Sequence, residues 1–136
     1  MSQSPFLLRA DVLLIADYSA ARTLQNFTLS LWNGNRFGFN ASNISNFDPT
    51  HMGYFLEFAT WYHKHGENDP NFMGVCSQMI AKREKWAAAN RAELDKLREM
   101  DPKAYEGTTS DYWRHIDDLE RVHARNLELG FIRDPE

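Results

Sequence analysis

The sequence has one cysteine, no long apolar run and no marked excess of either charge, and each absence excludes a class of protein. Because Cys76 is the only cysteine, the chain can form neither an internal disulfide nor a cysteine-based zinc site. No stretch approaches the roughly 20 apolar residues that a membrane-spanning helix requires. The N-terminal stretch lacks the basic and apolar regions of a signal peptide. We therefore expect a cytoplasmic protein that does not associate with a membrane.

The charge balance argues against a nucleic acid as the main partner. The chain has 15 basic and 19 acidic side chains, for a net charge of −4, whereas nucleic-acid-binding proteins concentrate Lys and Arg. One basic cluster, Lys82, Arg83 and Lys85, is interrupted by Glu84, a pattern typical of a solvated helix face. A role for this cluster as an accessory contact to nucleic acid is kept as an alternative hypothesis.

The sequence also lacks the patterns of strands and repeats. No segment alternates apolar and polar residues with the period of two that a half-buried strand shows, and no stretch repeats. The length of 136 residues and the apolar content of 43% suit one domain with one core. We expect residues 1–136 to form a single all-α domain of four main helices, arranged as an up-down or an irregular orthogonal bundle.

The prolines mark where the helices begin. Each proline follows Ser or Asp, and four of these pairs predict helix starts, at Pro5, Pro49, Pro70 and Pro102. Apolar residues recurring at steps of three and four then predict helices over residues 5–31, 49–65 and 70–100. At the second of these, Asp48 suits the N-cap and Gly66 the C-terminal end.

The last helix carries the residues of a metal hypothesis. Thr108 starts this helix in a sequence resembling a capping box, and Gly130 ends it. Within it, Glu120 and His123 form a Glu-x-x-His step of the kind that carboxylate-bridged metal bundles use, and His115 lies earlier on the same helix. The sequence contains no second such step. A metal-dependent enzyme or metal sensor with these three ligands is the second alternative hypothesis.

The aromatic residues carry the main functional hypothesis. Beside its core face, the helix over residues 49–65 has a second aromatic stripe, Tyr54, Phe58 and Trp61. Tyr112 and Trp113 form another aromatic pair on the last helix. Aromatics are enriched at the centres of protein interfaces, so these five residues form either a contact surface or part of the monomer's own core.

Nothing in the sequence points to catalysis. Cys76 falls on the apolar face of its helix, where a cysteine behaves as a small hydrophobic residue. No serine follows a strand in a tight turn, and no glycine-rich loop lies between a strand and a helix. We name no catalytic residue and expect no cofactor. The predicted function is that of a non-catalytic helical protein that acts through protein contacts with a partner or with a second copy of itself, as a homodimer.

One stretch resembles a known family. Residues 33–47 are rich in Asn, Gly and Ser but also contain large apolar residues, so we expect a structured loop rather than a solvated one. Together with the end of the preceding helix, the run resembles small uncharacterised bacterial proteins that are often carried by plasmids, phages or integrated elements. The matching positions are Leu31-Trp32-Asn33, Gly38-Phe39, Ile44, Phe47 and Asp48. The resemblance implies a helix-loop-helix core and a bacterial or mobile-element origin, but no activity.

Overall fold

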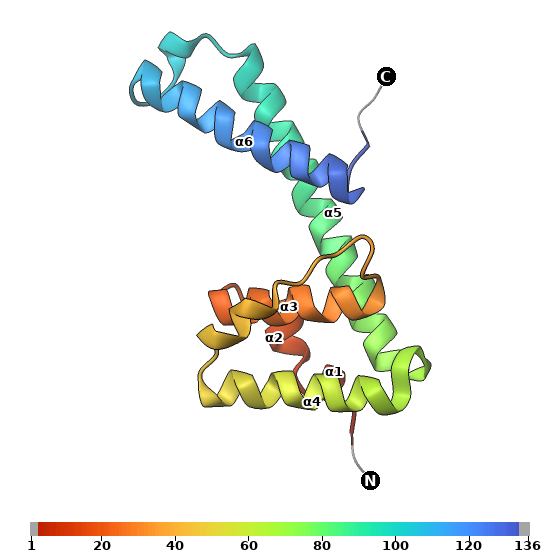
Figure 1. The fold of residues 1–136 in the computed structure, drawn as a ribbon. Helices are drawn as coiled ribbons and strands as arrows, with labels where there is room; N and C mark the ends of the chain where they lie inside the picture. Colours follow the sequence, from red (N-terminus) through yellow and green to blue (C-terminus); the bar gives the residue numbers. More distant parts are fainter. Residues whose placement is uncertain (1–2, 134–136) are drawn as a thin grey trace. The chain divides into compact units, whose positions relative to one another are not determined.

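The protein is all-α, as the sequence predicts. The computed structural model describes residues 3–133, and all regular structure within that range is helical (Figure 1). The longer helices are α3 (Ser19–Trp32), α4 (Pro49–His65), α5 (Pro70–Glu99) and α6 (Thr109–Leu129). The shorter helices are α1 (Pro5–Leu8), α2 (Ala10–Leu14) and the 3₁₀ turns η1 (Ala41–Asn46), η2 (Gly66–Asn68) and η3 (Pro102–Ala104).

The chain divides into two compact units, and the single domain over residues 1–136 stays a prediction. The first unit runs through Met79 and the second begins at Ile80, so the division falls within α5. Each unit contains its own buried apolar residues. Each unit is described by itself below.

The predicted ends of α4 and α6 are confirmed. The Asp48 carboxylate accepts a hydrogen bond of 2.8 Å from the backbone N–H of His51 at the start of α4. At the start of α6, the Thr108 and Asp111 side chains each accept from the backbone N–H of the other residue, which completes a capping box. Gly130 ends α6 in the left-handed conformation, with φ of 75°. Local hydrogen bonds therefore define the ends of these helices.

The prediction of one continuous helix over residues 5–31 is wrong. The segment divides into α1, α2 and α3, and Tyr18 has an extended backbone immediately before α3. The Gln25 side chain donates to the backbone carbonyls of Val12 and Ala16, at 3.1 and 2.9 Å. These bonds give a donor to two backbone carbonyls that lose their helical partners at the break. No glycine or proline lies at the break, so the sequence carries no local signal for it.

A cluster of aromatic rings forms the centre of the first unit. The Phe6 ring stacks on Phe58 with the centroids 4.9 Å apart, and it meets the edge of Phe72 at 5.0 Å. All three side chains are almost completely buried. They come from α1, α4 and the first part of α5, so this cluster joins three helices. Phe6 therefore contacts α4 and α5 from a short helix that is separate from α3.

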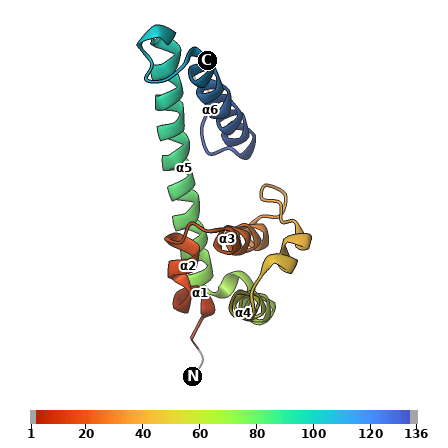
Figure 2. The ribbon, with the colours of Figure 1, turned by 90° about the vertical axis from the view of Figure 1, so that its left-hand side faces the viewer.

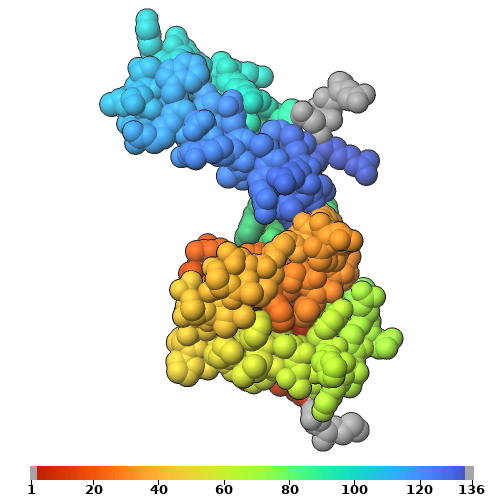
Figure 3. Space-filling model, viewed as in Figure 1, coloured from red at the N-terminus to blue at the C-terminus, as the bar shows by residue number. Residues whose placement is uncertain are grey.

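The loop over residues 33–47 packs against α3 and α4 within the first unit and is structured, as predicted. Phe37 is buried, and the Phe39 ring lies 5.1 Å from that of Phe27 on α3. Phe47 lies 5.9 Å from Phe55 on α4. Figure 3 shows the atoms of this segment, in gold, against those of α3 and α4.

The second unit is a helical hairpin. In it α6 runs beside the second part of α5 (Figure 2). Leu94 and Leu97 of α5 form a buried cluster with Tyr112 and Ile116 of α6. The Tyr112 hydroxyl donates to the Leu97 carbonyl at 2.5 Å, so the one polar atom of this buried ring has a partner.

Substitutions of Phe58 and Leu56, both on α4, test the packing of the aromatic cluster in the first unit. Phe58 has no exposed surface, whereas the Leu56 side chain is 52% exposed. Replacing Phe58 by Ala should lower the free energy of unfolding by about 3–5 kcal/mol, because it leaves a cavity. Leu56→Ala should change it by less than about 0.5 kcal/mol. Urea unfolding of both variants measures the difference, and equal effects would contradict the assignment of Phe58 to the core.

Candidate functional site

The first unit has a groove on its surface between α1 and α4. It has a volume of about 520 Å³. We call it the α1–α4 groove and define it by its lining residues: Gln3, Pro5, Leu8, Arg9, Glu57, Thr60, Trp61, Lys64 and His65. All of them belong to the first unit.

The apolar surface of the groove comes from short α1 as well as from α4. Leu8 lies at the end of α1 and is 50% exposed, although it is a large aliphatic residue. Its neighbour Leu7 is 52% exposed. On α4, exposed Leu56 lies one turn before Thr60, which lines the groove. Of these three leucines, Leu8 is the one that lines the groove, so its exposed side chain is the one available there to another molecule.

The indole of Trp61 is held in place by a buried carboxylate. Trp61 Nε1 donates to Asp69 Oδ2 at 2.8 Å, and the Ser4 hydroxyl donates to the same oxygen at 2.6 Å. The backbone N–H of Asn71 donates to Asp69 Oδ1 at 2.9 Å. Burial opposes ionisation of Asp69, but these hydrogen bonds outweigh it and lower the pKa of its carboxyl. The wall of the groove at Trp61 is therefore formed before any partner binds.

Charged groups lie at the rim of the groove. Arg9 Nε lies 3.4 Å from Glu57 Oε2, and the Arg9 guanidinium also lies 4.7 Å from the centre of the Tyr54 ring. Lys64 is exposed in the last turn of α4. The neighbouring His65 is exposed as well, and its ring lies 4.2 Å from that of Trp61. Charge therefore surrounds an apolar floor, which is the usual arrangement of a protein interface.

The structure separates the five residues predicted to form a contact surface. Phe58 and Tyr112 are buried in the two units, so neither can contact a partner in this conformation. Tyr54 is half-buried beneath Arg9. Trp61 lines the α1–α4 groove, and Trp113 is 56% exposed in the second unit. Phe58 and Tyr112 are therefore core residues of their units, and the second aromatic stripe of α4 enters the core at Phe58.

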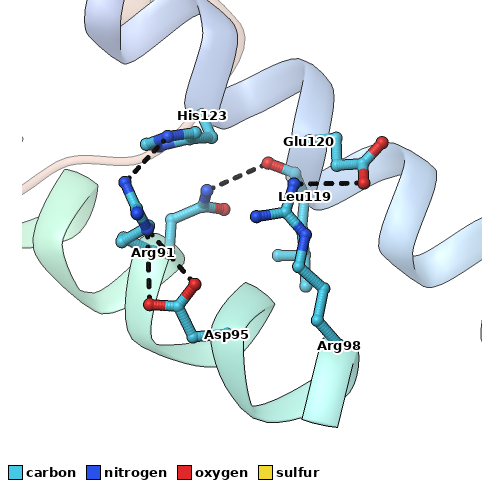
Figure 4. Close-up of polar contacts among 7 residues, drawn as sticks. Arg91, Asp95, Arg98, Leu119, Glu120 and His123 are labelled. Carbon is cyan, nitrogen blue, oxygen red and sulfur yellow. Dashed lines mark hydrogen bonds and ion pairs between the residues drawn. The ribbon is translucent and has the colours of Figure 1, made fainter. Parts of the chain in front are cut away.

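The residues of the metal hypothesis do not form a site. His115 Nδ1 lies 3.1 Å from the Tyr105 hydroxyl. Glu120 accepts from Arg98 at 3.2 Å, and His123 Nε2 lies 3.2 Å from Arg91 Nη1 (Figure 4). Within residues 3–133, no group of three potential ligands is close enough to hold a metal ion. The Glu-x-x-His step instead joins α6 to α5 in the hairpin.

The basic cluster on α5 does not present three exposed cations. Lys82 Nζ lies 4.9 Å from the centre of the Trp86 ring, in a cation–π contact. Arg83 is half-buried, and burial lowers the pKa of its guanidinium. Of the three side chains, Lys85 alone is exposed. Phosphate contacts need several accessible cations, so this geometry does not favour the nucleic-acid hypothesis.

A polar chain that the sequence analysis missed links the starts of α3 and α4. His51 Nδ1 lies 2.8 Å from Asp48 Oδ1, and His51 Nε2 lies 2.8 Å from the Tyr18 hydroxyl. The spacing of Asp48 and His51 is visible in the sequence, but nothing there places Tyr18 beside them. Partial burial raises the pKa of Tyr18, and the Tyr54 hydroxyl and the Asp11 and Asp48 carboxylates raise it further. A phenol with a raised pKa is a poor nucleophile, so this chain serves to join two helices.

Cys76 lies in the first unit as a buried thiol, as predicted. It has no exposed surface, and burial raises its pKa to about 12. The thiolate, which is the reactive form, is therefore not populated near neutral pH.

The comparisons with known proteins assign no relative. Neither the protein-family models, the curated proteins nor the solved structures give a match to this chain. Within the described range, the structure has no helix of the length and apolar character needed to cross a membrane. The support for a candidate site is therefore the geometry of the α1–α4 groove alone.

Asp69 should stabilise the first unit in a pH-dependent way. Asp69→Ala removes a buried acceptor of three hydrogen bonds and should lower the free energy of unfolding at neutral pH by about 3 kcal/mol. Because the folded-state pKa is lowered, this stabilisation is present above the ordinary value of 3.8 and is lost as the pH falls through the folded value. The difference between the variant and the wild type should therefore shrink in acid.

A matched control is Asp101→Ala, which removes the exposed carboxylate that caps η3. This change should lower the free energy of unfolding by only about 1 kcal/mol. Urea unfolding at several pH values measures both variants. An Asp69→Ala effect no larger than that of Asp101→Ala, or one that grows in acid, would contradict the role assigned to Asp69.

Proposed function

We propose that this protein is a non-catalytic helical protein that acts by binding a protein partner at the α1–α4 groove. The partner is another protein or a second copy of the chain. The exposure of Leu8 carries the proposal, because this large aliphatic side chain lies in a groove beside an indole that is already held in place. Burying a leucine in an interface contributes roughly 1.5–3 kcal/mol.

The polar groups of the groove support binding rather than catalysis. Arg9 and Glu57 form an ion pair with each other at the rim. Lys64 and His65 are exposed to water. A catalytic acid or base is usually a buried side chain beside the reacting group. None of these four side chains is buried.

The cellular setting is part of the same proposal. A single buried thiol suits a reducing compartment, so we place the protein in the cytoplasm. The resemblance over residues 27–48 supports a bacterial or mobile-element origin.

The groove hypothesis is tested with two leucine-sized residues of the first unit. Leu8→Glu places a charge in the groove, whereas Ile15→Glu makes the same kind of change at the C-cap of α2, a residue that is 75% exposed and does not line the groove. Leu8→Glu should weaken partner binding or self-association at least about tenfold, which corresponds to 1.4 kcal/mol. Ile15→Glu should leave it unchanged.

Two measurements read the outcome. Light scattering on a sizing column gives the mass of the wild type and of each variant, and affinity capture from the native host shows whether a partner binds in fixed proportion. Circular dichroism confirms that both variants remain helical. A wild-type chain that is monomeric and captures no partner would contradict the proposal, as would equal binding by Leu8→Glu and Ile15→Glu.

A further inference from the structure

We propose that the α1–α4 groove takes an acidic segment of a partner protein, in which an apolar side chain is flanked by Asp or Glu. This inference rests on the proposed function and adds the chemistry of the partner. It depends on three features of the groove: its apolar floor, the balance of charge at its rim and the geometry of Arg9.

The floor requires an apolar side chain. Pro5 and Leu8 of α1 face the groove with Trp61 of α4. The volume of about 520 Å³ falls within the range of roughly 300–1,000 Å³ that binding pockets occupy. Because Asp69 holds the indole, an entering side chain meets a formed surface and does not have to order it, which favours affinity.

The rim has an excess of positive charge, although the whole chain has a net charge of −4. Arg9 and Lys64 are its cations, and Glu57 is its one carboxylate among the lining residues. Within residues 3–133, Lys64 forms no ion pair. The rim is therefore complementary to carboxylates, and like charge would disfavour a basic partner.

Arg9 remains able to bind a partner's carboxylate. Its two contacts with Glu57 are long, with Nε 3.4 Å from Oε2 and Nη2 3.5 Å from Oε1. Good charge-assisted hydrogen bonds of this kind measure about 2.7–2.9 Å. A guanidinium has five N–H donors. Arg9 can therefore donate to a partner's carboxylate while it remains paired with Glu57, or it can exchange Glu57 for that carboxylate.

The occupant that satisfies all three features is a peptide segment. Its apolar side chain fills the floor, and its neighbouring carboxylates reach Arg9 and Lys64. Two helices flank the groove, so an amphipathic helix laid between them is the mode of recognition that the shape favours.

A selection from a library of random peptides against the immobilised full-length chain tests the inference. The selected peptides should be enriched in an apolar residue with Asp or Glu nearby. A synthetic copy of the strongest peptide is then titrated against the purified chain by fluorescence polarisation. Leu8→Glu should abolish measurable binding, and raising the salt concentration should weaken the wild-type interaction.

Lys64→Glu measures the contribution of the rim. A rim pair contributes about 0.2–1 kcal/mol and a reversal adds repulsion, so the Kd should rise about three- to tenfold. Lys85→Glu is the matched control, because Lys85 is an exposed lysine of the second unit. It makes the same charge change outside the groove and should leave the Kd unchanged.

The possible failures are distinguishable. Selected peptides that need Leu8 but are neutral or basic would overturn the acidic-segment inference and leave the proposed groove function standing. The same holds for equal effects of Lys64→Glu and Lys85→Glu. Selection of no peptide would overturn the inference, and peptides that bind Leu8→Glu as well as the wild type would overturn both proposals.

Discussion

The first unit depends on the hydrogen bonds that the buried carboxylate of Asp69 accepts. Ser4 at the start of α1, Trp61 on α4 and the backbone N–H of Asn71 in α5 all donate to it, and the residue is only 6% exposed. A buried charge that loses its partners is strongly destabilising, so the three helices must keep these positions. Because one of the donors is the indole that lines the α1–α4 groove, the interaction that stabilises the unit also preforms its candidate binding site.

Many of the aromatic residues fill the cores of the two units. Phe6, Phe58 and Phe72 fill the centre of the first unit, and Tyr112 fills that of the second. Small units have a high ratio of surface to volume, so large rings that each bury a wide area are an effective way to form a core. Exposed aliphatic residues, such as Leu8, are the better guide to function here, because nothing in the unit's own packing requires their exposure.

The polar contacts of the second unit show that the role of a helical motif depends on the residues that face it. The Glu-x-x-His step on α6 has the spacing of a metal ligand pair, yet Glu120 meets Arg98 and His123 meets Arg91 on the facing helix (Figure 4). Spacing along one helix places two side chains on the same face, but a metal site also requires ligands from other elements. Here those elements supply arginines, which hold the hairpin together.

Local signals in the sequence are sufficient to predict the all-α class and most helix ends. Caps such as Asp48 and Thr108 act through hydrogen bonds to residues three positions away, and apolar periodicity is equally local. Long-range packing is what breaks the segment over residues 5–31, divides the chain into two units and forms the groove between α1 and α4. Those outcomes depend on pairs distant in sequence, such as Ser4 and Asp69, 65 positions apart, whose contact no local pattern encodes.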